Sequence, residues 1–344
     1  MYSYGVTQQG TYHVKHNIVC QDYHYIEKVN DDIIIAAVAD GLGSETSSDV
    51  ASKIAAIESV KFCVTSWIVD GRHEDYLSLI ERAFTYALEK INERVVLDNG
   101  DVNQYDTTLC LSIFMNDKVY WGQSGDSGAV VLTTDGYYES ITKQQRDENG
   151  CVYPLAFGKE KWEFGYKTQV ASVLMATDGM LETLFPVLLR SEPVNIYVAL
   201  ARFLMDRDVL DFENNGEQAV SDKMFAFMNS IPDNQVNDDK TIVALVNAKL
   251  AVKHLDDAYY EIPNWSELQR KRQEEFNRLA YPHLYSDSTI ASSSTIDNAI
   301  DKVTDETVQQ DVEVCQSDTG AKDVEVSSKK GILEKLQFRK KKNE

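Results

Sequence analysis

The chain has 344 residues, of which 43% are hydrophobic and 10% aromatic, so one large domain with a substantial core is expected. A formal net charge of -21 argues against a nucleic-acid ligand, because its phosphates repel an acidic surface. The five cysteines are scattered and form no CxxC pair, which disfavours structural zinc and a disulfide framework. The first residues lack a charged stretch followed by an apolar one, so we expect no secretion signal, and the strongest apolar run, residues 33–39, is too short for a bilayer. We therefore expect a cytoplasmic protein.

Strand-like and helix-like patterns alternate in the first part of the chain. Residues 1–7 predict a first strand, and the continuous apolar run 33–39 predicts a strand buried on both faces. Residues 44–68 read as a helix with serine and threonine cap candidates at its start. A second helix is predicted over residues 74–96, where apolar side chains recur at three- and four-residue steps.

The middle of the chain predicts further strands. Four short ones are separated by turn residues and favour antiparallel hairpins: 107–114, 118–122, 128–133 and 137–141. The polar, glycine-containing stretch 143–167 predicts an irregular surface excursion or flap. Residues 171–176 and 241–246 predict two more strands, with helical patterns between 193 and 229. Two central sheets between helices satisfy all of these apolar faces.

The pattern changes after residue 248, which we take as the end of the catalytic domain, residues 1–248. Residues 249–285 form a predicted helical extension, in which the charged stretch 265–279 favours an exposed helix. Residues 286–344 are rich in Ser, Thr, Asp and Glu, so we predict a disordered acidic tail with a basic end. This end is a solvated linker or, alternatively, residues 332–342 dock on a partner or an anionic membrane surface.

Four aspartates carry most of the chemical information in the sequence. Each follows an apolar run or a polar turn: Asp40 in VADGLGS, Asp126 in GQSGDSG, Asp178 in LMATDGM and Asp238 in NDDKTIVAL. A carboxylate at the mouth of a buried strand is costly unless it is paired or binds a cation. Any single Asp-Gly pair is more often a plain turn. Together, these residues suggest one site for hard divalent ions and hydrolysis of a phosphate ester.

The order of these motifs is more specific than any one of them. An early CQD, a DGLGS between strand and helix, then DTTL, GDS, TDGM and DDKT follow one another along residues 1–248. This series resembles the metal-dependent protein phosphatase family, the protein phosphatase 2C type, and especially its bacterial-style members. The resemblance implies an α+β fold, a four-layer α-β-β-α sandwich with two central, mainly antiparallel sheets. It places a metal site at one end of the sandwich.

The resemblance also implies roles for individual residues. Asp40 matches the aspartate that bridges two Mn2+ or Mg2+ ions, and Gly41 matches a carbonyl ligand. Asp178 and Asp238 match the other direct ligands of the first ion. Asp126, with Asp178, matches a third and weaker ion site. Asp22 of CQD matches the acidic residue that orients metal-bound waters, so Asp40 and Asp22 are the expected catalytic residues.

The sequence departs from the family pattern at the substrate phosphate. Many members carry an arginine at the position of Asn17, so Lys15 and His13 are the candidate substitutes for binding phosphate. Lysine supplies a point charge but cannot reproduce the bidentate fork of arginine. Leu42 stands where some animal members have a histidine general acid, so the leaving group takes its proton from water or another group.

We therefore expect a monomeric serine/threonine protein phosphatase that uses metal-activated water and forms no phospho-enzyme. Its expected partners are phosphoprotein substrates and a cognate Ser/Thr kinase. The alternative is a catalytically impaired, phosphatase-like interaction module that binds phosphoproteins, which the loss of arginine at Asn17 favours. Retention of Asp40, Asp178 and Asp238 together favours the enzyme.

Overall fold

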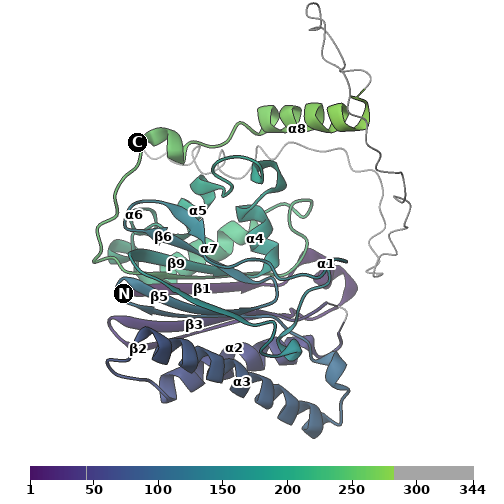
Figure 1. The fold of residues 1–344 in the computed structure, drawn as a ribbon, viewed down its shortest axis with the longest axis vertical. Helices are drawn as coiled ribbons and strands as arrows, with labels where there is room; N and C mark the ends of the chain where they lie inside the picture. The colour runs from purple at the N-terminus through teal and green to yellow at the C-terminus, as the bar shows by residue number, and fades with distance from the viewer. Residues whose placement is uncertain (44, 283–344) are drawn as a thin grey trace, which may run out of the picture. The chain divides into compact units, whose positions relative to one another are not determined.

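The computed structural model describes residues 1–43 and 45–282 (Figure 1). Ser44, the first residue of a predicted helix, and the predicted disordered tail, residues 286–344, lie outside this range. The chain divides into one unit, Met1–Pro263, and a second that begins at Asn264 and contains α8 (Trp265–Ala280). Across the described residues, every helix is too short or too polar to cross a bilayer.

Two five-stranded antiparallel sheets form the centre of the first unit. The first has the strand order β2 (Asp22–Asn30), β3 (Ile33–Asp40), β4 (Leu109–Met115), β5 (Lys118–Ser124) and β8 (Glu163–Lys167). The second has the order β1 (Tyr2–Gln8), β10 (Lys240–Val246), β9 (Val170–Ala176), β6 (Gly128–Thr133) and β7 (Tyr138–Ser140). All pairings are antiparallel.

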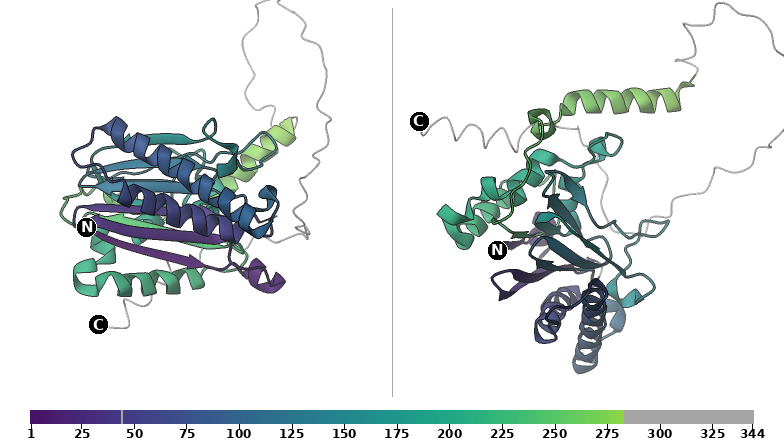
Figure 2. Two further views of the ribbon diagram at one scale, coloured as in Figure 1. Left: turned by 90° about the horizontal axis from the view of Figure 1, so that it is seen from below. Right: turned by 60° about the vertical axis from the view of Figure 1, so that its left-hand side comes forward.

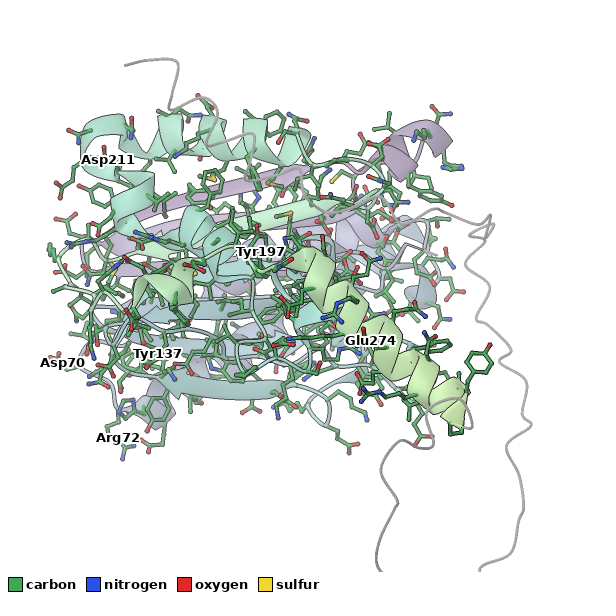
Figure 3. All side chains as sticks on the ribbon, turned by 90° about the horizontal axis from the view of Figure 1, so that it is seen from above. Asp70, Arg72, Tyr137, Tyr197, Asp211 and Glu274 are labelled. Atoms are coloured by element: carbon green, nitrogen blue, oxygen red, sulfur yellow. The ribbon has the colours of Figure 1, made fainter. Side chains whose placement is uncertain are left out.

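Helices cover the outer face of each sheet, as Figures 1 and 2 show. The long helices α2 (Ser48–Thr65) and α3 (His73–Asp98) lie side by side on the first sheet. The second sheet is covered by α4 (Asp178–Leu184), α5 (Val198–Met205) and α7 (Phe212–Asn229), with α6 (Arg207–Leu210) against α5. Asp211, at the junction of α6 and α7, is labelled in Figure 3. The predicted four-layer α+β sandwich is confirmed.

The continuous apolar run of β3 follows from its position between two cores. Alternate side chains of a strand point to opposite faces. Ile35, Ala37 and Ala39 belong to the core beneath α2 and α3. The intervening Ile34, Ala36 and Val38 belong to the core between the two sheets. Both faces of β3 are therefore buried away from solvent, which explains why a polar residue appears only at the end of the strand.

Three segments differ from what the sequence predicts. The strand β2 follows directly from the CQD motif but its mixed polarity hides it, because its side chains are only partly buried. The strand β8 lies within residues 143–167, which were predicted to be irregular, and it forms by pairing with β5 at the sheet edge. The short helix α1 (Thr11–His16), between β1 and β2, also has no clear sequence signal.

Candidate active site

The acidic residues singled out in the sequence meet at one end of the sandwich. Asp40 is the last residue of β3 and pairs in register with Asp22, the first residue of β2. Asp126 lies in the turn from β5 to β6, next to the start of β4. In the second sheet, the end of β9 pairs with the start of β10, so Asp178 and Asp238 flank neighbouring strand ends. Antiparallel register thus brings five distant residues together.

Three of these carboxylates form one compact group. Oxygen atoms of Asp40, Asp126 and Asp178 lie within 4.8 Å of one another. Asp126 is buried, and 24% of the Asp178 side chain is exposed. Asp238 belongs to a neighbouring group with His13 and Asp239 and is itself exposed. The charge of Asp238 nevertheless raises the pKa of Asp40 and of Asp178, so the two acidic groups interact electrostatically.

The carboxylates raise one another's pKa, as expected for like charges in a poorly hydrated site. Burial raises the pKa of Asp40 well above its usual value, and the charges of Asp22, Asp178 and Asp126 add to the effect. Burial, followed by Asp126 and Asp238, raises the pKa of Asp178 to about 7. Such a site binds protons or cations to relieve the repulsion.

The donor set fits hard divalent ions. Carboxylate oxygens at one locus are the ligands that Mg2+ and Mn2+ prefer. Oxygen atoms of Asp40, Asp126 and Asp178 meet within 4.8 Å of one another, and each of these carboxylates has a pKa raised by burial. The site thus has the oxygen ligands, and the excess negative charge, that a divalent ion requires.

Backbone contacts hold the β3 end in place. The carbonyl of Asp40 accepts hydrogen bonds from Thr108 N at 2.8 Å and Thr107 Oγ1 at 2.9 Å. Gly41 packs against the first turn of α2, and a Cβ there would lie 2.5 Å from the carbonyl oxygen of Ser48. Only glycine allows this approach, so the Asp-Gly pair reflects packing as well as turn formation.

Asp22 lies behind the group and is fixed by hydroxyls of the second sheet. Its Oδ2 accepts a hydrogen bond of 2.7 Å from Thr177 Oγ1. Burial raises the pKa of Asp22 well above its usual value, and the charge of Asp239 adds to this. Asp22 is thus a fixed acceptor bridging the two sheets beside Asp40.

The predicted phosphate-binding residues lie on α1 and already have acidic partners. His13 is buried, and its Nδ1 lies 2.9 Å from Asp239 Oδ1. This contact raises the pKa of His13, so the imidazolium form is favoured. Burial opposes ionisation of Asp239, but bonds from His13, Gly10 N and Gln21 N outweigh it and lower its pKa. The exposed Lys15 pairs with Asp233 at 3.1 Å.

Arg146 is a site residue that sequence reasoning missed. Its Nη2 donates to Asp126 Oδ2 at 2.5 Å and lies 3.5 Å from Asp178 Oδ2. It comes from residues 143–158, between β7 and β8, the stretch predicted to be a surface excursion. No local pattern marks this arginine, because only the fold of that stretch brings it to the carboxylates.

The comparisons with known proteins agree with this fold. The family profile of protein phosphatase 2C matches residues 9–207, more than half of the chain. A search of curated proteins finds no match.

Several solved structures are similar to this chain at low sequence identity. An arginine-to-lysine variant of a bacterial serine phosphatase is 13% identical, with a TM-score of 0.50, over 74% of this chain and 100% of that one. The serine/threonine phosphatase Stp1 from Staphylococcus aureus is 15% identical (TM-score 0.49, 72% and 95% covered). The PstP catalytic domain in complex with 2 manganese ions is 18% identical (TM-score 0.47, 70% and 96% covered).

The profile match, the paired antiparallel sheets and the acidic group at their end agree with one another. The chain belongs to the protein phosphatase 2C family and is a phosphoprotein phosphatase.

Proposed function

We propose that this protein hydrolyses phosphoserine and phosphothreonine monoesters with Mn2+ or Mg2+ held by the acidic group. The proposed ligands are the carboxylates of Asp40, Asp126, Asp178 and Asp238, together with the carbonyl of Gly41. When bound, the ions supply an activated water and neutralise charge on the phosphate. The observation that carries the proposal is the meeting of Asp40, Asp126 and Asp178 within 4.8 Å.

The chain's own residues would orient the reactants around these ligands. Asp22, held by Thr177, presents a fixed acceptor for a water beside Asp40. His13 carries the favoured positive charge on the Asp238 side of the site, which suits an anionic phosphate. Lys15 adds a second cation on the same helix once its exposed pair with Asp233 opens; such surface pairs contribute only about 0–1 kcal/mol. In this scheme water attacks the phosphorus atom of the substrate, so no covalent phospho-enzyme forms.

The test is Mn2+-dependent hydrolysis of p-nitrophenyl phosphate and of a phosphothreonine peptide. We expect Asp40→Asn and Asp178→Asn each to lower kcat at least about 100-fold, since each removes a charged ligand from the site. Asp135→Asn is the matched control: Asp135 also precedes a glycine, but it is exposed in the turn between β6 and β7. It should retain wild-type activity.

Equal rates in wild type and both site variants would refute the metal mechanism. Activity toward neither substrate, with tight binding of the phosphopeptide, would favour the interaction-module alternative. Asn17 in place of arginine and the pairing of Lys15 with Asp233 are the features on which that alternative rests.

A further inference from the structure

Arg146 places a positive charge inside the acidic group itself. One nitrogen, Nη2, reaches Asp126 Oδ2 at 2.5 Å and Asp178 Oδ2 at 3.5 Å. Asp126 is only 2% exposed, whereas 36% of the arginine side chain is exposed. Removing the partner of a buried carboxylate costs more than breaking a surface ion pair, because it leaves the buried charge uncompensated. The contact is therefore a built part of the site.

The backbone around Arg146 is tied to the backbone around Asp126. Gln145 N donates to Gly125 O at 3.1 Å, and Gly125 N donates to Gln145 Oε1 at 2.9 Å. Gln123 Nε2 also donates to Lys143 O at 2.7 Å. The two Gln145–Gly125 bonds link the residues directly adjacent to the ion pair, and the third bond lies three residues away, so the guanidinium is held near Asp126 in a defined position. They also connect the segment 143–158 mechanically to the metal site.

The guanidinium uses the oxygens that a divalent ion at this edge would need. Asp40, Asp126 and Asp178 offer oxygens close enough for one ion to share. Mg2+ binds such oxygens at about 2.1 Å and requires their lone pairs. Two cations that share the Asp126 and Asp178 oxygens repel each other. Occupation by the arginine and occupation by an ion therefore compete.

We propose that Arg146 is a built-in competitor of a divalent ion at the Asp126–Asp178 edge of the site. This inference rests on the proposed function, because it assumes that the remaining carboxylates hold ions. With Arg146 in place, this edge is neutralised by the protein, and an ion enters only when the arginine withdraws. Arg146 is a positioning residue in this scheme, and the position of residues 143–158 sets the affinity of the weakest ion.

The test measures Mn2+ binding directly, by calorimetry and by the electron paramagnetic resonance signal of free Mn2+. Arg146→Gln should add one Mn2+ site or tighten the weakest one at least tenfold. Asp126→Asn should remove that gain when combined with Arg146→Gln. Arg146→Lys keeps a positive charge on a shorter and more strongly hydrated side chain, so its Mn2+ affinity should fall between those of wild type and Arg146→Gln. Arg190→Gln is the control for loss of an exposed arginine and should bind as wild type does.

An unchanged or weakened weakest site in folded Arg146→Gln would overturn the proposal. If that variant does not fold, the comparison of Arg146→Lys with wild type decides: tighter binding supports competition and equal or weaker binding refutes it. The proposed function fails separately, if wild type binds no Mn2+ or hydrolyses phosphopeptides without it. If wild type shows normal Mn2+-dependent hydrolysis and the Mn2+-binding isotherms of wild type and Arg146→Gln are identical, only the proposed role of Arg146 is refuted.

Discussion

Asp178 links the chemistry of the site to protein stability. Its pKa is raised from 3.8 to about 7, chiefly by burial and then by the charges of Asp126 and Asp238. The folded protein therefore holds this proton more tightly than the unfolded chain does. By linkage, this contribution to the free energy of unfolding is present below about pH 4 and is lost as the pH rises toward 7. In the proposed function, a bound divalent ion would take over the role of this proton.

We predict that, without metal, Asp178→Asn is more stable than wild type at pH 8, by about 1–3 kcal/mol. This corresponds to several degrees in Tm, and the difference should disappear near pH 4, where both side chains are neutral. Thermal unfolding in a chelating buffer at both pH values measures it, with Asp135→Asn as the control. Added Mn2+ should then stabilise wild type much more than the variant. If the stability of wild type and of Asp178→Asn changed with pH in the same way, the raised pKa of Asp178 would be contradicted.

At the residue scale, sequence reasoning identified the acidic side chains but not their neutralising partner. Asp40, Asp126 and Asp178 stand beside turn or strand signals that can be read locally. Arg146 has no such signal, since its relation to Asp126 depends on how residues 143–158 fold back. Likewise, the pairing of His13 with Asp239, the neighbour of the predicted ligand Asp238, is visible only in three dimensions.

The junction of β3 and α2 positions Asp40 through a close backbone contact. A Cβ on Gly41 would approach Ser48 O to 2.5 Å and Ser48 Cβ to 2.8 Å. Relief requires a shift of the helix start or of the strand end. Gly43, two residues later, is a natural comparison, because its nearest neighbour would be Gln21 Oε1 at an ordinary 3.6 Å.

We expect Gly41→Ala to lower the free energy of unfolding by about 1–3 kcal/mol, as overpacking usually does. The displaced Asp40 should also raise the Mn2+ concentration needed for half-maximal activity. Gly43→Ala should change stability by less than about 0.5 kcal/mol. Urea unfolding and a Mn2+ titration of phosphatase activity measure both effects. Equal behaviour of the two alanine variants would show that the contact with Ser48 is unimportant.

Elements with a regular burial pattern were predictable, and those without one were not. The strand β3 is a continuous apolar run because both of its faces are buried, and the long helix α3 has a clear apolar period because one of its faces packs on the core. The edge strand β8 and the strand β2 are partly exposed, so their sequences lack a strong period. Pairing with a neighbouring strand stabilises them, and such pairing is a non-local property.

For the molecule as a whole, the end of the catalytic unit differs between sequence and contacts. The sequence pattern changes at residue 248, but the compact unit extends to Pro263. Lys253 N donates to Thr134 O at 2.8 Å, and Tyr259 Oη accepts a bond from Tyr138 N. The guanidinium of Arg202 also lies 4.7 Å from the centre of the Tyr260 ring. Residues 249–263 thus contribute contacts to the second sheet and to α5.

We predict that a protein ending at Pro263 keeps the Tm and the p-nitrophenyl phosphate activity of the full chain. A protein ending at Ala248 should lose several degrees in Tm, because it exposes Tyr138 and leaves the edge of the second sheet uncovered. Differential scanning calorimetry of the two truncations measures this. If the two truncated proteins had the same Tm, the catalytic domain would end at residue 248, as the sequence pattern suggests.

The amino-acid sequence on its own determined the alternation of strands and helices, the acidic residue types of the site and the family to which the chain belongs. These features depend on residue spacing, turn chemistry and burial of one face, which are short-range properties. The tertiary structure alone decided which carboxylates share one site, that Arg146 sits among them and that α1 residues pair with acids. Distances between strand ends depend on register and layer packing, and these emerge only when remote segments meet.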